Sequence, residues 1–294
     1  MSENRPDNRK AVLVVSSHVV RGSVGNRAAV FALERLGHPV WALPTVILSW
    51  HPGHGPATRH VVPDAQFQGI VDDLIGAPWL GEVGAVLSGY LGDAGQAEGV
   101  ARLVEAVKAK NPDALYLCDP VIGDLGGLYV PEATAEAIRD RLLPLASIAT
   151  PNRFELAWMA GAALQDNGAI VEAALALGPE RVLVTSALPL LAGGTGNLLL
   201  NARDVLLAEH RVVPKPPNGL GDLLSAVFLA RLMEGKSDEK ALHLATGSVF
   251  EILARTVRRA SDELTLESDS ESLVRPLALV QIRRLGHPAE RRHR

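Results

Sequence analysis

Ala11-Val12-Leu13-Val14-Val15 is an unbroken apolar run, and the polar triplet Ser16-Ser17-His18 follows it directly. A short apolar run without alternation is typical of a strand that is buried on both faces of a parallel sheet. Residues 26–36 come next with helical spacing, so that Ala28 and Ala32 share one face. A buried strand followed by such a helix predicts the start of a strand–helix–strand unit.

The same alternation of short apolar runs and helical segments continues along most of the chain. Such an alternation is typical of parallel strands joined by crossover helices. It predicts an α/β fold class, with a mostly parallel central sheet flanked by helices on both faces. Further strands are expected at 40–43, 85–87, 114–117, 148–149 and 181–185, and helices near 64–75, 95–110, 131–142, 152–160 and 168–177.

The pattern changes after Thr185. Residues 188–203 are predicted to form a hairpin, with Gly193-Gly194-Thr195-Gly196-Asn197 as its turn, and 205–213 an edge strand. The sheet would therefore have an antiparallel margin, and two helices follow, at 222–234 and about 239–258. We expect one domain over residues 11–284, between a flexible N-terminus (1–10) and a disordered basic tail (285–294).

Composition excludes several classes of protein. The chain has 294 residues, 47% of them hydrophobic and 21% charged, with a net charge of −4. Such a charge gives no attraction to nucleic acid or to an anionic membrane, so a small molecule is the expected partner. One cysteine excludes an intramolecular disulfide and a zinc cluster built on cysteines. Since no run approaches the roughly 20 apolar residues of a spanning helix, we expect a cytoplasmic protein.

Asn218-Gly219-Leu220-Gly221-Asp222 leads directly into an apolar helical segment. Glycines leave backbone N–H groups uncovered, and the start of a helix adds a partial positive charge, so Gly219 and Gly221 predict an anion-binding turn. An aspartate in such a turn is suited to take a proton from a nucleophile beside a bound phosphate. The turn therefore predicts phosphoryl transfer to a hydroxyl with Asp222 as base. The alternative is that Asp222 only caps the helix.

Polar residues follow the other predicted strands as well. Ligands of such sheets bind at the carboxyl ends of the strands, so these residues are candidates for one site. Thr150, Asn152 and Glu155 have an alternative role in capping a helix, because Asn and Glu three residues apart form a capping box. The candidates are Ser16-Ser17-His18, Ser88-Gly89-Tyr90, Cys118-Asp119-Pro120, Gly123-Asp124, Thr150 to Glu155 and Thr185-Ser186.

Glu155 is placed to hold Mg²⁺ through water, since magnesium keeps several waters and shares its shell with substrate phosphates. Asp119 and Asp124 supply further negative charge for a metal–nucleotide complex. The segment His51-Pro52-Gly53-His54 contains a Pro-Gly turn rather than a helix face that presents ligands. We therefore interpret it as a loop that contacts substrate, not as a transition-metal site.

Six motifs in this order resemble the pyridoxal kinases of the ribokinase superfamily, over residues from about 12 to about 258. The last two of them occur across sugar kinases and indicate the superfamily, whereas the first three indicate pyridoxal. They are Ser16-Ser17-His18-Val19-Val20-Arg21-Gly22-Ser23-Val24-Gly25-Asn26, Trp41-Ala42-Leu43-Pro44-Thr45-Val46, Ser88-Gly89-Tyr90-Leu91-Gly92, Cys118-Asp119-Pro120-Val121-Ile122-Gly123-Asp124, Thr150-Pro151-Asn152-x-x-Glu155 and Gly219-x-Gly221-Asp222.

The resemblance implies a ribokinase-like fold and phosphorylation of pyridoxal to pyridoxal 5′-phosphate in a salvage pathway. ATP with Mg²⁺, a monovalent cation such as K⁺ and a homodimer are implied as well. Ser17 would hydrogen-bond the pyridine substrate, Thr45 and Tyr90 would line its pocket, and His51, Pro52 and Gly53 would form the loop over it. The region of ATP and the two cations would comprise Asp119, Thr150, Asn152, Glu155, Thr185 and Ser186, with Glu155 and Asp119 at the metal, Asp124 near the phosphates and Val212 and Val213 beside the adenine.

Two features depart from the family pattern. Arg21 stands where the family often has an aromatic residue, and the loop from Asp124 to Tyr129 is short. They are expected to affect closure of the pocket and exclusion of water. Two other functions stay open: a hydroxymethylpyrimidine or sugar kinase that uses the same anion site, and a protein that binds the vitamer without catalysis. Asp222 and Glu155 argue against the second, because a binder needs neither.

Overall fold

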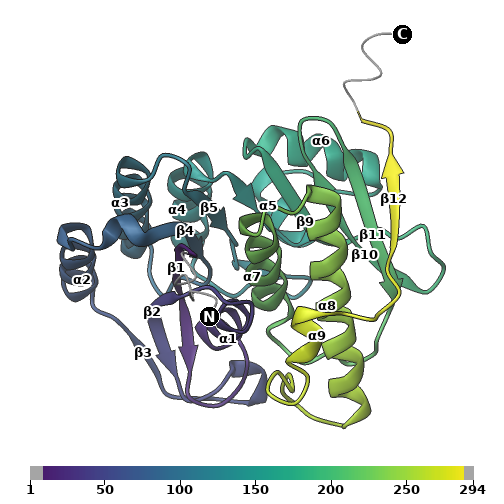
Figure 1. Cartoon of the computed structure of the whole chain (residues 1–294), viewed down its shortest axis with the longest axis horizontal. Helices are drawn as coiled ribbons and strands as arrows, with labels where there is room; N and C mark the ends of the chain where they lie inside the picture. The colour runs from purple at the N-terminus through teal and green to yellow at the C-terminus, as the bar shows by residue number, and fades with distance from the viewer. Residues whose placement is uncertain (1–8, 288–294) are drawn as a thin grey trace, which may run out of the picture.

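The structure, a computed structural model, describes residues 9–287. Its main sheet contains β1 (Ala11–Val19), β2 (Val40–Leu48), β3 (Arg59–Val61), β4 (Val83–Ser88), β5 (Leu115–Cys118), β8 (Ile148–Ala149), β9 (Arg181–Ala187), β10 (Gly194–Leu200), β11 (Val205–Arg211) and β12 (Gln281–Leu285). The strands follow the order β12-β11-β10-β9-β8-β5-β4-β1-β2-β3 (Figure 1). A separate hairpin is formed by β6 (Gly123–Asp124) and β7 (Gly127–Leu128).

Most of the sheet is parallel. Strands β2, β1, β4, β5, β8 and β9 pair in parallel, whereas β3 and the group β10, β11 and β12 pair antiparallel with their neighbours. The predicted fold class, including the antiparallel margin, is therefore confirmed. The parallel centre brings the carboxyl ends of these six strands to one edge of the sheet, which is where ligands of such folds bind.

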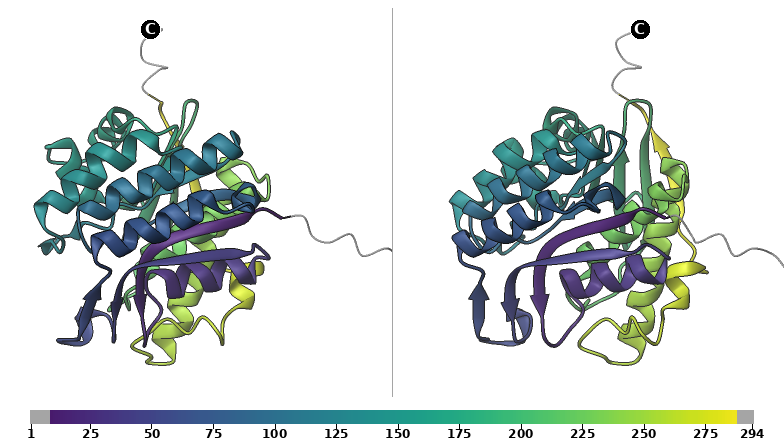
Figure 2. Two further views of the ribbon diagram at one scale, coloured as in Figure 1. Left: turned by 90° about the vertical axis from the view of Figure 1, so that its left-hand side faces the viewer. Right: turned by 60° about the vertical axis from the view of Figure 1, so that its left-hand side comes forward.

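Helices cover both faces of the sheet, as Figures 1 and 2 show. Alternate residues of β1 face opposite sides: Val12 and Val14 pack in one core with the helices at 26–35, 220–233 and 238–258, and Leu13 and Val15 pack in another with the helices at 64–76, 95–110 and 132–137. The helices are α1 (Asn26–Arg35), α2 (Asp64–Gly76), α3 (Gly95–Lys110), α4 (Glu132–Ala137), α5 (Arg153–Ala160), α6 (Asn167–Leu177), α7 (Leu220–Met233), α8 (Asp238–Arg258) and α9 (Glu271–Val274), with short helical turns at Pro52–His54 (η1), Leu80–Glu82 (η2), Ile138–Leu142 (η3) and Leu143–Leu145 (η4).

Two strands are longer than their apolar runs predicted. β1 continues to Val19, with an irregular register between Ser16 and His18, and β2 continues to Leu48. Ser17 and Thr45 therefore lie within strands rather than after them, and both are buried. The predicted helix at 131–142 is also divided, because α4 ends at Ala137 and the π-helical turn η3 follows.

The predicted turn of the antiparallel hairpin is wrong. Residues 188–193 make the connection, and Gly194 to Asn197 are paired residues of β10, opposite Arg211 to Ala208. Gly196 serves close packing rather than a turn, because a Cβ there would lie 2.7 Å from Leu207 Cδ1. Turn and close approach both favour glycine, so the sequence pattern did not separate them.

The margin also extends further than predicted. β11 is not an edge strand, because β12 pairs antiparallel with it from Glu209 opposite Gln281 to Val205 opposite Leu285. Leu285, which we assigned to the tail, is thus the last residue of β12. Of the segments expected to be flexible or disordered, residues 1–8 and 288–294 lie outside the described residues, whereas the Lys10 ammonium donates a hydrogen bond to the Gly81 carbonyl, 2.8 Å away.

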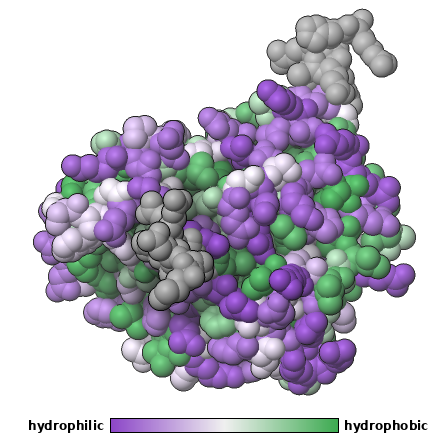
Figure 3. Space-filling view, viewed as in Figure 1, coloured by the Kyte–Doolittle hydropathy of each residue, from purple (hydrophilic) through white to green (hydrophobic). Residues whose placement is uncertain are grey.

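Within residues 9–287, none of the helices has the length and apolar character needed to span a bilayer. Figure 3 shows hydrophilic residues over most of the face in view, with hydrophobic ones scattered among them. Singly exposed apolar residues of this kind are common on folded proteins.

Candidate active site

A cavity of about 460 Å³ opens at the carboxyl ends of the parallel strands. Its walls come from β1, β2, β3, η1, the segments after β4, β5 and β8, and the start of α7. The sequence motifs that we singled out as one site thus supply most of its lining. The lining residues are Ser17, Val24, Leu48, His51, Pro52, Arg59, Tyr90, Asp119, Val121, Asp124, Tyr129, Thr150, Asn152, Glu155, Thr185, Asn218, Gly219, Gly221 and Asp222.

Gly219 fixes the turn that begins α7. Its φ is +93°, and a Cβ at this position would lie 2.0 Å from the Ser23 carbonyl oxygen, so both conformation and space require glycine. Gly219 is the N-cap residue of α7, and no side chain caps the helix. Backbone N–H groups of the first turn therefore stay available for an anion at the helix start.

Asp222 lies in the first turn of α7 rather than at its cap, so the alternative in which Asp222 caps the helix does not apply. Burial raises the pKa of its carboxyl to about 6, although the N–H groups of Gly25 and of Asp222 itself favour the ionised form. A carboxylate with a pKa near neutrality is suited to accept a proton at physiological pH.

Asp119 is a buried residue of the cavity wall, beside α7. The Ser225 hydroxyl lies 2.9 Å from both Asp119 Oδ2 and Thr150 Oγ1, and with its single proton it donates to one and accepts from the other. Burial, reinforced by the neighbouring carboxylates Glu155 and Asp222, raises the pKa of Asp119 well above its usual value. Each of the three acids is therefore harder to ionise when its neighbours are ionised.

Glu155 and Asn152 form the predicted capping box at the start of α5. The Asn152 side chain accepts the Glu155 N–H, and Glu155 Oε2 accepts the Asn152 N–H at 2.8 Å. Glu155 Oε1 accepts the Ile122 N–H, also at 2.8 Å, which holds the β6–β7 hairpin beside α5. Burial raises the pKa of Glu155 to about 7 against these hydrogen bonds. Glu155 thus caps α5 and lines the cavity at the same time.

The opposite part of the cavity is lined by His51, Pro52, Ser17 and Tyr90. His51 Nδ1 accepts the Gly53 N–H at 3.0 Å, which leaves the ring proton of neutral His51 on Nε2 as a donor. Burial, followed by the nearby charge of His54, lowers the pKa of His51, so the neutral form is favoured. This wall therefore offers donors and one aromatic ring rather than carboxylates.

Five residues of the predicted site do not line the cavity. Thr45 is fully buried and its hydroxyl donates to the Tyr90 carbonyl at 2.7 Å, so it lies behind Tyr90. Gly53 lies behind His51. Ser186 follows Thr185 in β9, whereas Val212, with 54% of its surface exposed, and Val213 follow β11.

Arg59 and Tyr129 line the cavity although the motifs did not include them. Arg59 begins β3, and its Nη2 donates to the Gly92 carbonyl at 2.9 Å and lies 3.4 Å from the Tyr90 hydroxyl. Tyr129 reaches the cavity through the β6–β7 hairpin, where its N–H donates to the Ile122 carbonyl. Arg59 falls in a Pro- and Gly-rich segment without regular periodicity, so no local pattern indicated its position in the site.

Arg21, which departs from the family pattern, pairs with an acidic residue in the segment after α8. The Arg21 guanidinium donates to both oxygens of Asp262, at 2.9 and 2.8 Å. The next residue, Glu263, accepts the Ser23 N–H at 3.1 Å and lies 2.8 Å from His54 Nε2. The segment after α8 therefore holds both the β1–α1 loop and η1, the two loops that border the cavity.

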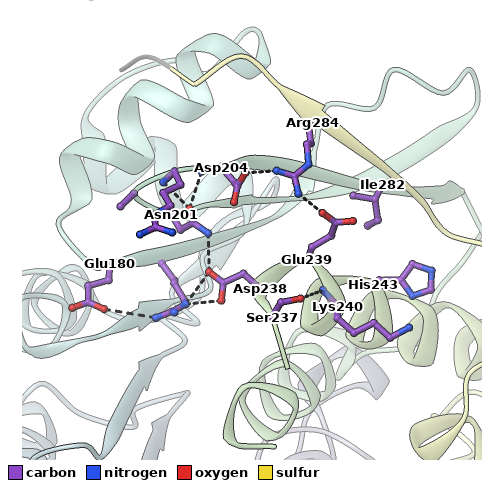
Figure 4. Close-up of a pocket in the computed structure, with 13 residues that line it drawn as sticks. Glu180, Asn201, Asp204, Ser237, Asp238, Glu239, Lys240, His243, Ile282 and Arg284 are labelled. Atoms are coloured by element: carbon purple, nitrogen blue, oxygen red, sulfur yellow. Dashed lines mark hydrogen bonds and ion pairs between the residues drawn. The ribbon is translucent and has the colours of Figure 1, made fainter. Parts of the chain in front are cut away.

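A second and larger cavity, of about 940 Å³, lies between the start of α8 and strand β12 (Figure 4). Several of its charged side chains pair with one another: Arg181 with Asp238, and Arg284 with both Asp204 and Glu239. These ion pairs join β12 and β9 to α8. Because they satisfy one another, we assign them a structural role.

Comparison with known proteins shows what this chain is related to. The phosphomethylpyrimidine kinase family matches residues 64–265. The chain is 39% identical over 282 residues to a pyridoxal kinase, PdxY, of Rubrobacter xylanophilus, covering 94% of this chain and 97% of that protein. The PdxY of Pseudomonas putida is 38% identical over 283 residues, with 94% and 98% covered. The solved pyridoxal kinase of Leishmania donovani, in complex with ADP and pyridoxamine, has a TM-score of 0.88 and 29% identity, with 94% of this chain and 100% of that chain covered.

The parallel sheet, the glycine turn at the start of α7 and these matches define a small-molecule kinase with the ribokinase-like fold. Within that class, the chain belongs to the pyridoxal kinase family. The family and the fold that the sequence motifs indicated are thereby confirmed.

Gly219 and Gly221 form a matched pair for testing the turn. Gly219→Ala should lower the thermal unfolding midpoint, because its Cβ would overlap the Ser23 carbonyl and its φ is positive. Gly221→Ala should leave the midpoint near that of the parent, because its Cβ would meet nothing within 4 Å. Differential scanning calorimetry measures both. Equal midpoints for the two variants would contradict the role given to Gly219.

Proposed function

We propose that the chain transfers the γ-phosphoryl group of ATP to the 5′-hydroxymethyl group of pyridoxal, giving pyridoxal 5′-phosphate for salvage of the vitamer. The observation that carries the proposal is the position of Asp222, in the first turn of α7 and in the same cavity as Tyr90 and His51. A proton acceptor at an anion-binding helix start, beside a ring-sized pocket, suits phosphorylation of a hydroxyl on a ring.

In this reaction Asp222 accepts the hydroxyl proton, and the first N–H groups of α7 stabilise charge on the transferred phosphoryl group. Phosphoryl transfer passes through a loose transition state, so positioning and charge stabilisation contribute most of the catalysis. Gly219 and Gly221 leave room for phosphate oxygens to approach the backbone. The pKa of about 6 supports a base that is ionised at neutral pH.

Mg²⁺ fits the carboxylate end of the cavity. Asp119, Glu155 and Asp222 all have raised pKa values, which indicates uncompensated negative charge that a divalent cation would neutralise. Within residues 9–287 no three or more acidic, His or Cys side chains are arranged so that they could hold a metal ion by themselves. A Mg²⁺ that shares its shell with water and phosphate, held through Glu155 and Asp119, suits this arrangement. The cation supplies charge neutralisation for the phosphates.

The nucleotide is assigned to the same end. Asp124, Thr150, Asn152 and Thr185 line the cavity there and offer polar contacts to phosphates and metal-bound water. Ser186, which follows Thr185, and the pair Val212 and Val213 extend from this end, and we propose that the two valines flank the adenine. A monovalent cation such as K⁺ stays a prediction for this region.

Pyridoxal is assigned to the other end. Ser17 and His51 are positioned to donate hydrogen bonds to the substrate ring or its oxygens, and Tyr90 presents the aromatic surface. Thr45 contributes through its hydrogen bond to the Tyr90 carbonyl. Pro52 and Gly53 would form the cover, since η1 lies over this wall.

The homodimer implied by the resemblance also stays a prediction. The margin at 188–213, through which subunits were expected to pair, is covered by β12 on its outer side. A dimer would therefore have to use β12 or another surface.

A hydroxymethylpyrimidine kinase is the second candidate function, because the matching family is described as phosphomethylpyrimidine kinase. Purified protein with MgATP and a panel of pyridoxal, pyridoxine, hydroxymethylpyrimidine and ribose tests both. Phosphorylation of pyridoxal with the highest kcat/KM is expected. Preference for the pyrimidine would support the second candidate, and binding of a vitamer without product from any acceptor would support a non-catalytic binding protein.

Asp222→Asn should lower kcat by about 10²–10⁴-fold, the range expected for loss of a general base, while pyridoxal still binds. In the parent protein, kcat/KM should fall as pH decreases through about 6, because Asp222 must be ionised to accept the proton. A coupled assay of ADP release across pH 5–8 measures both. An unchanged kcat for the variant would remove Asp222 from the mechanism.

Glu155→Gln should raise the Mg²⁺ concentration that gives half-maximal velocity, because the amide carries no charge for the cation or its water shell. The Gln carbonyl oxygen can still accept the Asn152 N–H and keep the capping box, but the NH2 group cannot accept the Ile122 N–H, so some loss of stability is expected as well. Velocity as a function of free Mg²⁺ is the measurement, with the unfolding midpoint recorded as a control. The same Mg²⁺ dependence in variant and parent would argue against a metal role.

A further inference from the structure

The cavity has an uneven distribution of charge. Among the described residues that line it, four carry carboxyl groups and Arg59 is the one with a permanent positive charge. Arg59 is on β3, which is four strand positions from β5, the strand that leads to Asp119. At about 4.8 Å per strand this is roughly 19 Å between the two strands. The cation and the metal-binding carboxylates therefore belong to opposite ends of the cavity.

The Arg59 guanidinium is held by hydrogen bonds through one of its nitrogens, and its other N–H groups are not bonded to protein within residues 9–287. Its Nη2 donates to the Gly92 carbonyl at 2.9 Å and approaches the Tyr90 hydroxyl at 3.4 Å. Within residues 9–287 its Nε and Nη1 groups have no hydrogen bond or ion pair to protein. A guanidinium held at one corner, with N–H donors left over at the edge of a cavity, is suited to receive an anionic oxygen.

Asp222 and Arg59 are connected through two consecutive residues. A Cβ on Gly89 would lie 3.9 Å from Asp222 Oδ1, and the next residue, Tyr90, contacts Arg59 through its hydroxyl. The segment Gly89-Tyr90 thus runs from beside the proton acceptor to the cation. A substrate with one six-membered ring along Tyr90 would have its reacting hydroxymethyl group at Asp222 and its other substituents toward Arg59.

Pyridoxal and pyridoxamine differ in the charge of the group at the 4′ position. At neutral pH the ring 3-hydroxyl is ionised in pyridoxal, and its 4′ carbon is an uncharged aldehyde. Pyridoxamine instead carries an ammonium group at the 4′ position. A fixed cation attracts the ring oxygen of either, but it repels the ammonium.

We propose that Arg59 is a specificity-determining residue of the acceptor pocket, which binds the anionic ring oxygen of the substrate and disfavours pyridoxamine relative to pyridoxal. The proposal rests on the proposed function, because it places a pyridoxal-type ring along Tyr90. A unit charge about 6 Å from another in a solvent-lined cavity changes relative affinity by about tenfold. The expected selectivity due to Arg59 is of that size.

The test uses the full chain with Arg59→Gln, which removes the charge, Arg59→Lys, which retains it, and Arg258→Gln as a control. Arg258 is exposed in the last turn of α8 and does not line the cavity, so its variant makes the same change in net charge elsewhere. For each protein, dissociation constants of pyridoxal, pyridoxine and pyridoxamine are measured by titration calorimetry, and kcat/KM values by ADP release.

Arg59→Gln should decrease the preference for pyridoxal over pyridoxamine by about tenfold in both measurements, whereas Arg59→Lys and Arg258→Gln should largely retain it. If Arg59 merely supported Tyr90, Arg59→Gln would weaken all three vitamers by one factor. That result, or an unchanged preference, would overturn the proposal.

Binding separates this proposal from the proposed function. Vitamers that bind the parent without being phosphorylated would contradict the kinase reaction, and the ratio of dissociation constants would still decide the role of Arg59. A parent that binds none of the three vitamers would contradict both.

Discussion

The contact between Gly219 and the Ser23 carbonyl is the constraint on which the site depends. Only a residue without a side chain fits there, and its positive φ directs the chain into α7 so that Asp222 enters the cavity from the first turn. Ser23 is itself fixed, because its N–H donates to Glu263 and its hydroxyl donates to the Leu264 carbonyl. Three segments that are distant in sequence therefore meet at one point, and the position of the proton acceptor follows from their packing.

Electrostatics explains why this point is also suited to phosphates. Asp119, Glu155 and Asp222 are held in or beside one cavity, and burial raises the pKa of each. Hydrogen bonds from backbone N–H groups and from Ser225 only partly offset that cost. A divalent cation that accompanies a nucleotide would lower the pKa values of the acids near it. The proposed Mg²⁺–nucleotide complex would thus offset part of the cost of burying these carboxylates.

The sequence predicted a feature correctly where its pattern is typical of one structure only. Unbroken apolar runs such as Ala11–Val15 are such a pattern, so the parallel strands and the polar residues at their ends were predicted. A glycine is typical both of a turn and of close packing inside a strand. Gly194 and Gly196 were therefore placed in a turn although they pack inside β10. β12 was missed because its residues are mostly half-buried or exposed and lack an apolar face. Arg59 was missed because its place in the cavity comes from β3 pairing with β2, which no local pattern reveals.

The hydrogen bond between Glu263 and the β1–α1 loop affects the order in which the parts of the cavity form during folding. Ser23 and Glu263 are separated by 240 residues, although one hydrogen bond joins them. During synthesis the strands of the parallel core emerge first and can begin to pair, since domains fold progressively from the N-terminus. The loops that border the cavity lack this tether until the segment after α8 has left the ribosome. The border of the cavity would thus be completed only after Glu263 and Leu264 have been synthesised.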